Sequence, residues 1–189
     1  MQVFGFVGTF GAGKGTAIEL FTRILSEKGK VYAFSTSDMF REELKKKGFG
    51  IDRETLRCFA NEMRTAHGAG YAGKLAVKAI EKIKPDYALV DSMRNPGEAD
   101  ALKKFYGKNF TLVAIDAPIE LRHARTKVRN RDKGDQLTFE EFRASEDLES
   151  KTTNPNSQNI PALIKMADVK IENNGTQEEL KTKLAKLIQ

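Results

Sequence analysis

Short apolar runs alternate with longer amphipathic segments along the whole chain. The runs with the continuous apolar character of a buried strand are residues 3–7, 31–34, 87–90, 110–115 and 169–171. Such runs are typical of strands that are covered on both faces, as in a parallel sheet. The pattern therefore predicts a buried sheet of five strands.

The segments between these runs repeat their apolar positions with the period of an α-helix. In residues 14–27, for example, Phe21, Ile24 and Leu25 lie on one helical face, and Gly29 follows as a stop signal. Further helices are predicted over residues 39–47, 53–65 (with Asp52 as N-cap), 74–84, 118–128, 138–150 and 177–187. Alternating strands and helices predict an α/β fold, and no repeat or second core divides the chain, so we expect a single domain over residues 1–189.

Composition limits the class of protein. Of the 189 residues 40% are hydrophobic and 31% charged, which suits one packed core with a well solvated surface. The net charge is +6, but the basic residues are scattered among acidic ones, so nucleic acid is not the expected partner. The single cysteine, Cys58, excludes an internal disulfide and a Cys-rich zinc site. No apolar run approaches the length of a membrane span and none has the form of a signal peptide, so we expect a cytoplasmic protein.

The segment GTFGAGK, residues 8–14, fits the G-x-x-x-x-G-K frame of a phosphate-binding loop. It lies between the first predicted strand and the first predicted helix, as this motif requires. Glycines let successive backbone N–H groups point inward, and the helix N-terminus adds positive charge. We therefore expect ATP with Mg²⁺ to bind here, and Lys14 to reach the β- and γ-phosphates. The residues expected to hold ATP are Gly8, Gly11, Ala12, Gly13, Lys14, Gly15 and Thr16.

The loop departs from the general motif at Gly15, where a Ser or Thr hydroxyl usually binds Mg²⁺; here the hydroxyl comes one residue later, at Thr16. The tail Gly-Lys-Gly-Thr resembles that of the nucleoside-monophosphate kinases of the adenylate kinase type, although Phe10 stands where those kinases usually carry proline. In that family Mg²⁺ is held largely through water and nucleotide oxygens. The resemblance implies a P-loop NTPase fold with strand order 2-3-1-4-5 and a small helical acceptor-binding region at about residues 38–73.

A second candidate site is STSDMFR, residues 35–41, which follows the second predicted strand. It resembles the Ser-Thr-Gly-Asp-Met-Leu-Arg segment of adenylate kinases, which implies that Thr36 lies near the acceptor base, with Asp38 in the same acceptor-binding set, and that Arg41 holds the acceptor phosphate. Independently, an arginine one turn into a helix after a strand points toward the crevice at the strand ends, and guanidinium matches phosphate bidentately. The alternative is that a hydroxyl of this segment caps the helix and Arg41 lies on a solvated face.

A third segment, DSMRNPGE, begins where the apolar run 87–90 ends. Asp91 can hold the water shell of Mg²⁺ together with Thr16, although an ordinary strand-end cap is the alternative. Arg94 reaches the same crevice. Adenylate kinases carry Asp-Gly-x-Pro-Arg here, which implies that Arg94 binds the acceptor phosphate, with a spacing one residue shorter. The S-x-R-N-P-G-E form is closer to small archaeal and phage-like kinases, including deoxynucleotide kinases and relatives of dephospho-CoA kinase.

Arginines concentrate after the fourth predicted strand, at Arg122, Arg125, Arg129 and Arg131. The first three fall at helical spacing on one face, where a triphosphate would neutralise their mutual repulsion. Since phosphoryl transfer needs positioning and cations more than an acid–base residue, we expect these three to be catalytic together with Lys14, beside a short lid over residues 127–139. A solvated basic helix is the alternative, and RNA binding is a weaker one because no aromatic residues interleave with the arginines.

These motifs predict an ATP- and Mg²⁺-dependent kinase that transfers the γ-phosphoryl group to a phosphorylated small acceptor, in first place a (deoxy)nucleoside monophosphate. Two alternatives stay open: a dephospho-CoA kinase-like enzyme, and a P-loop ATPase or nucleotide-binding regulator. A monomer or a small homo-oligomer is expected. Residues 173–175 could lie near the adenine by resemblance, but we favour a plain helix cap by Thr176, with Glu179 at the third helical position.

Overall fold

The computed structural model describes residues 1–129, 133–150 and 154–188 and contains one five-stranded sheet. Its strands are β1 (Gln2–Val7), β2 (Val31–Ser35), β3 (Tyr87–Asp91), β4 (Phe110–Asp116) and β5 (Val169–Glu172). All neighbouring strands pair in parallel, in the order β2-β3-β1-β4-β5. The predicted number, direction and order of the strands are confirmed.

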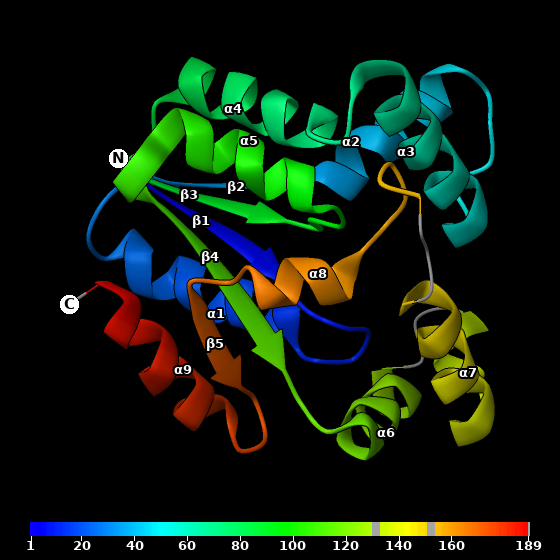
Figure 1. Cartoon of the computed structure of the whole chain (residues 1–189). Helices are drawn as coiled ribbons and strands as arrows, with labels where there is room; N and C mark the ends of the chain where they lie inside the picture. Colours follow the sequence, from blue (N-terminus) through cyan, green and yellow to red (C-terminus); the bar gives the residue numbers. More distant parts are fainter. Residues whose placement is uncertain (130–132, 151–153, 189) are drawn as a thin grey trace.

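Helices cover both faces of this sheet (Figure 1). They are α1 (Lys14–Ser26), α2 (Thr36–Lys46), α3 (Arg53–His67), α4 (Tyr71–Ile83), α5 (Pro96–Tyr106), α6 (Ile119–Arg129), α7 (Phe139–Ser150), α8 (Ile160–Lys165) and α9 (Gln177–Ala185). Short 3-10 turns span Gly107–Asn109, Lys133–Gln136 and Lys186–Ile188. Helices α1 and α9 pack on one face of the sheet and α4, α5 and α8 on the other, while α2, α3, α6 and α7 lie beyond the carboxyl ends of the strands (Figure 1).

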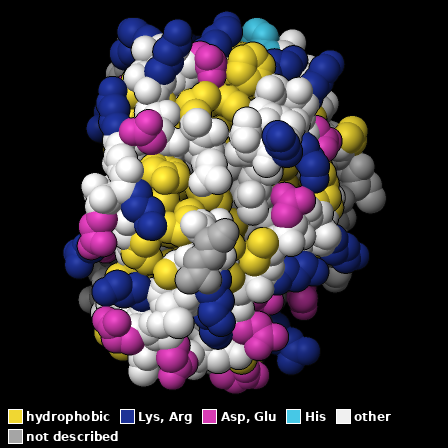
Figure 2. Space-filling model, turned by 90° about the vertical axis from the view of Figure 1, so that its left-hand side faces the viewer, with side chains coloured by type: hydrophobic (Ala, Val, Ile, Leu, Met, Phe, Trp, Pro, Cys, Tyr) yellow, Lys and Arg dark blue, Asp and Glu magenta, His cyan; other side chains and the backbone are white. Residues whose placement is uncertain are grey.

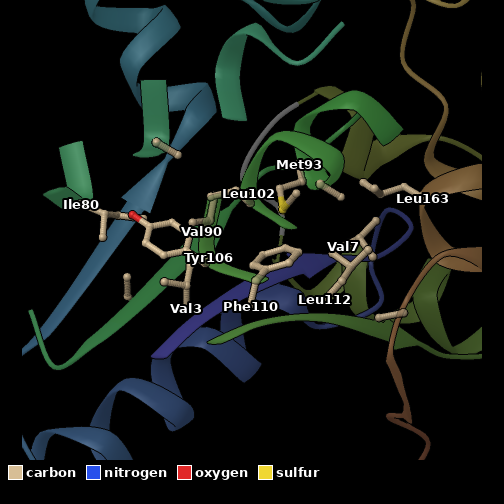
Figure 3. Close-up of a cluster of buried hydrophobic side chains, with 14 of the residues drawn as sticks. Val3, Val7, Ile80, Val90, Met93, Leu102, Tyr106, Phe110, Leu112 and Leu163 are labelled. Atoms are coloured by element: carbon tan, nitrogen blue, oxygen red, sulfur yellow. The ribbon is translucent and has the colours of Figure 1, made fainter. Parts of the chain in front are cut away.

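Each face of the sheet has its own apolar core. Figure 3 shows one of them, where Val3 and Val90 of the strands face Leu102 and Tyr106 of α5. The Tyr106 hydroxyl donates a hydrogen bond to Glu81 at 3.2 Å, and burial raises the pKa of this phenol far above its usual value. Burial on both faces explains why the strands read as continuous apolar runs.

Helices α2 and α3 and the start of α4 form a third, smaller cluster, centred on an edge-to-face pair of Phe40 and Phe59. This cluster coincides with the region expected to bind the acceptor. The predicted cap of α3 is confirmed, since the Asp52 carboxylate accepts hydrogen bonds from the backbone of Glu54 and Thr55, both at 3.0 Å.

Two helices were not predicted. Helix α5 begins at Pro96, which reads as a turn in sequence but is well placed in the first helical turn, where its missing N–H costs nothing. The Asn95 side chain caps it by accepting from Gly97 N at 2.8 Å. Helix α8 has only six residues, too few to show a period, and is capped by Asn159.

Charges on the side of the molecule near both chain termini are mixed. Figure 2 shows this face, with hydrophobic side chains at its centre and basic and acidic side chains interspersed around them. This distribution agrees with the scatter of charge in the sequence. Within the described ranges, no helix is long and apolar enough to cross a membrane.

Candidate functional site

A cavity of about 1570 Å³ lies at the carboxyl ends of the strands. Helices α2 and α3 lie on one side of it and α6 on the other, with the segment after β1 between them (Figure 1). Of the described residues that line the cavity, seven are cationic and four are acidic. The cations are Lys14, Arg41, Arg57, Arg64, Arg94, Arg125 and Arg129. Such a surplus of positive charge in a concave site favours an anionic ligand.

The loop from Gly8 to Gly13 is shaped by close approaches that exclude side chains. A Cβ at Gly8 would lie 2.5 Å from the carbonyl oxygen of Ile115, and one at Gly11 would lie 2.6 Å from that of Arg122. Gly11 and Gly13 have φ of +80° and +90°, in the left-handed region that favours glycine. No described side chain caps the N-terminus of α1, so its first N–H groups remain available to an anion. All seven residues expected to hold ATP line the cavity.

Lys14 and Asp91 form an ion pair inside the cavity. Lys14 Nζ donates to Asp91 Oδ1 at 2.6 Å, and the same oxygen accepts from the backbone of Ser92. The carboxylate of Asp91 thus pairs with the loop lysine in addition to accepting from the backbone at the end of its strand. Ser92 has φ of +62°, which is rare for a residue other than glycine and stores strain beside the site.

The donor set fits a metal that arrives with a nucleotide better than a resident metal. Within the described part of the chain, no three His, Cys, Asp or Glu side chains gather into a metal site. Thr16 lines the cavity, close in sequence to Lys14. A Cβ at Gly15 would have no described atom within 4 Å, so this glycine is not required by packing. One carboxylate and one hydroxyl could hold the water shell of Mg²⁺, while nucleotide oxygens supply the remaining ligands.

The segment after β2 places its predicted residues at the cavity, but with different roles. Ser35 caps α2 by accepting from Asp38 N at 3.2 Å. The Thr36 hydroxyl donates to the carbonyl of Ser92 at 2.9 Å, so this threonine holds the strained turn after β3. Arg41 lines the cavity and is paired with Asp38 at 2.5 Å. Each of the two interpretations of this segment is therefore correct in part. A hydroxyl, that of Ser35, caps the helix, and Arg41 lines the cavity.

The segment after β3 brings Arg94 to the cavity wall. Its neighbour Asn95 is 2% exposed and donates to the carbonyls of Pro155 and Ser157, at 2.8 and 2.7 Å. These bonds hold the loop that precedes α8, from which Gln158 reaches the cavity. The R-N-P-G-E segment thus places Arg94 at the cavity wall and, through Asn95, holds the loop that carries Gln158.

The structure places Arg122 away from the cavity and the other two described arginines of the run, Arg125 and Arg129, at its wall. Arg122 is 6% exposed and does not line the cavity. Its guanidinium pairs with Glu146 of α7 and donates to the carbonyls of Ala117 and Phe10, at 2.8 and 3.2 Å. The predicted common face is thus not formed, because a buried guanidinium needs local partners and Glu146 supplies them. Arg122 fixes the position of the phosphate loop instead.

Arg125 and Arg129 do line the cavity. Arg125 Nη2 donates to the carbonyl of Asn173 at 2.8 Å, while its buried Nη1 has no partner among the described atoms, and burial lowers the pKa of the guanidinium. Arg129 is paired with Asp135 and lies 5.0 Å from the centre of the Phe10 ring. Arg131 and residues 130–132 of the expected lid lie outside the described residues.

Two buried polar residues, Arg64 and Glu98, escaped the sequence reasoning, and a third, Asn173, has a contact that the resemblance did not indicate. Arg64 of α3 and Glu98 of α5 are each 1% exposed and form an ion pair at 2.9 Å. Asn173 follows β5 and donates from its side chain to the carbonyl of Ala12 at 2.9 Å, so it pins the phosphate loop. Thr176 caps α9 as favoured, yet the loop before it still reaches the cavity. The signal for Asn173 was its place directly after a strand.

Sequence comparison identifies relatives over the whole chain. The profile of the AAA domain family matches residues 7–143, which hold every predicted site residue. The UPF0200 protein of Sulfurisphaera tokodaii is 32% identical over 190 residues, covering 100% of this chain and 96% of that protein. The UPF0200/UPF0201 protein of Archaeoglobus fulgidus is 28% identical over 190 residues, and this chain spans 55% of its length.

Solved structures share the fold. An APS kinase of Mycobacterium tuberculosis, solved with AMPPNP and APS, matches with a TM-score of 0.58 and 16% identity, over 99% of this chain and 96% of its own. A shikimate kinase of Bacteroides thetaiotaomicron matches with a TM-score of 0.59 and 12% identity, over 99% and 98%. The chain therefore has the P-loop kinase fold. The profile match and the 32% identity show that it belongs to the AAA domain family and to the UPF0200 proteins.

Proposed function

We propose that this protein is an ATP- and Mg²⁺-dependent phosphotransferase whose acceptor is a small molecule carrying its own phosphate, in first place a (deoxy)nucleoside monophosphate. One observation carries the proposal. A single cavity joins the phosphate loop to a second set of guanidinium groups, on α2, on α3 and after β3. A hydrolase needs cations for one triphosphate only, whereas transfer between two phosphates needs a binding group for each.

The positions of the charged groups suggest a role for each residue in the proposed phosphoryl transfer. Lys14 would exchange Asp91 for the oxygens of the transferring group, where negative charge must be balanced. Asp91 would then be available to orient water on Mg²⁺, which supplies charge neutralisation at the β- and γ-phosphates when it is bound. Arg125 would offer its unpartnered Nη1 to the nucleotide, and Arg129 would lie beside it. Arg122 would act indirectly, by fixing the loop backbone at Phe10.

The acceptor end uses Arg41 and Arg94 for the acceptor phosphate, since guanidinium binds phosphate bidentately. Phe40, Leu56 and Ala60 give the same end an apolar wall. An apolar wall with several cations suits a phosphorylated molecule that also has a flat, apolar part, as a nucleotide does.

The test is an assay of ADP formation with a panel of acceptors. The panel comprises the common ribo- and deoxyribonucleoside monophosphates, dephospho-CoA, APS and shikimate, the last two because the fold neighbours are named for them. We expect ADP to form in a one-to-one ratio with a phosphorylated nucleoside monophosphate, and only when that acceptor is present. Equal ATP hydrolysis with and without every acceptor would reject the proposal and favour a nucleotide-dependent regulator.

Replacing Arg41 with alanine should raise the KM for the acceptor about 10- to 100-fold, because a charged hydrogen bond to phosphate is lost. The KM for ATP should change by no more than about twofold, since Arg41 belongs to α2 and is not part of the phosphate loop. Steady-state kinetics with each substrate varied in turn measure both values.

The matched control for Arg41 is Lys45→Ala, which removes an exposed cation from the same helix away from the cavity. It should leave both KM values within about twofold of the wild type. Equal increases in the two KM values for Arg41→Ala would remove Arg41 from the acceptor site.

A further inference from the structure

Arg64 is a buried cation in the wall of the cavity. It lies on α3 and is 1% exposed, whereas Arg41, which lines the same cavity, has a side chain that is 38% exposed. A charge this deep is retained only where the protein holds it with hydrogen bonds or has a use for it. The contacts of its guanidinium show how it is held.

Glu98 on α5 is the main partner of Arg64. Its Oε1 accepts from Arg64 Nε at 2.9 Å and lies 2.9 Å from Arg64 Nη2. Its Oε2 accepts from the backbone N–H of Arg94 at 2.8 Å. The buried carboxylate of Glu98 therefore fixes the orientation of the Arg64 guanidinium and also holds the backbone of the turn that carries Arg94. The two arginines reach the cavity wall from different elements, yet their positions depend on the same group.

The guanidinium of Arg64 retains hydrogen-bonding capacity. Its third nitrogen, Nη1, donates to Asn61 Oδ1 at 3.0 Å. These contacts occupy at most three of the five N–H donors of a guanidinium. A buried ion pair is seldom more stabilising than an apolar pair of the same size, so packing alone gives little reason for an arginine here. Its place in a cationic cavity supplies that reason.

We propose that Arg64 is an anion-binding residue of the acceptor site and that Glu98 is its positioning residue, acting on Arg94 through the same carboxylate. The ligand is a phosphomonoester dianion, because a doubly charged group can accept hydrogen bonds from several guanidinium groups at once. Naming that group as the acceptor's phosphate rests on the proposed function; the anion site itself does not.

Titration with inorganic phosphate, in the presence of saturating AMPPNP and Mg²⁺ to fill the phosphate loop, tests the anion site by calorimetry. Arg64→Lys and Glu98→Gln should each weaken phosphate binding about tenfold, because lysine loses the forked geometry and glutamine no longer fixes it. AMPPNP affinity should stay within about twofold of the wild type in both. The matched controls are Arg23→Lys and Glu19→Gln, an exposed Arg–Glu pair on α1, which should bind phosphate as the wild type does.

Two further measurements separate binding from folding. The double variant Arg64→Gln with Glu98→Gln keeps a hydrogen-bonding pair without buried charge, and it should fold yet lose phosphate binding. In the wild-type protein, the Nε–H resonance of Arg64 should shift when phosphate is added. An unshifted resonance, no phosphate binding by the wild type beside AMPPNP, or wild-type phosphate affinity in the folded variants would each overturn the proposal.

The experiments distinguish failure of the anion site from failure of the proposed function. If no acceptor supports ADP formation but phosphate binding still depends on Arg64 and Glu98, the anion site stands and the transferase does not. If a nucleoside monophosphate is phosphorylated while Arg64→Lys leaves phosphate affinity and the acceptor KM unchanged, the transferase stands and Arg64 is structural.

Discussion

Replacing Lys14 with alanine is expected to lower kcat by about a thousandfold or more, because the variant loses a cation that would balance charge on the transferring phosphoryl group. The substitution also leaves Asp91 without its 2.6 Å partner inside the cavity, so the carboxylate would repel the incoming triphosphate. The KM for ATP should therefore rise, while binding of the acceptor alone should be unchanged. Single-turnover kinetics separate the loss in chemistry from the loss in binding.

Lys74→Ala is the matched control for this experiment. Lys74 is exposed on α4 and does not line the cavity, so its loss should leave kcat within about twofold of the wild type. Near-normal turnover of Lys14→Ala would show that the loop is not the nucleotide site of this protein. Equal losses of kcat in Lys14→Ala and Lys74→Ala would indicate an effect of the protein's net charge and not of the phosphate loop.

The fold and the phosphate loop were predictable because each depends on local pattern. Continuous apolar runs identify strands that are covered on both faces, and a glycine frame between a strand and a helix identifies a loop that needs positive φ. Gly15 shows the limit of such a pattern. Its sequence position implied the type of loop, but only the structure shows that packing leaves room for a side chain there.

The residues that sequence reasoning missed or misplaced are those whose role depends on a distant partner. Arg64 and Glu98 are 34 positions apart, and Arg122 and Glu146 are 24 apart, each on different helices. Helical spacing correctly placed Arg122, Arg125 and Arg129 on one helix, but it could not show that Glu146 draws the first of them away from the cavity. Three-dimensional proximity of this kind leaves no periodic signal in one sequence.

The Lys14–Asp91 pair also makes Asp91→Asn a variant with opposite effects on two measurements. Asparagine keeps an acceptor for Ser92 N but removes the charge that holds Lys14. ATP without metal should therefore bind more tightly, because Lys14 no longer has to leave a carboxylate. Turnover should nevertheless fall about a hundredfold, and the Mg²⁺ concentration for half-maximal rate should rise about 10- to 100-fold, because the variant lacks the carboxylate that would orient water on the metal.

Asp116→Asn is the control that separates this effect from strand-end capping. Asp116 ends β4 as Asp91 ends β3, and its Oδ1 accepts from the next backbone N–H, of Ala117, at 2.9 Å, but it does not line the cavity. If the role of Asp91 were to cap its strand, the two variants would lose stability alike and neither would change the Mg²⁺ requirement. If Asp91 serves the metal, only Asp91→Asn raises that requirement, and it does so while strengthening metal-free ATP binding. A general loss of structure would weaken both, so the opposite signs identify the exchange of Lys14 between Asp91 and phosphate.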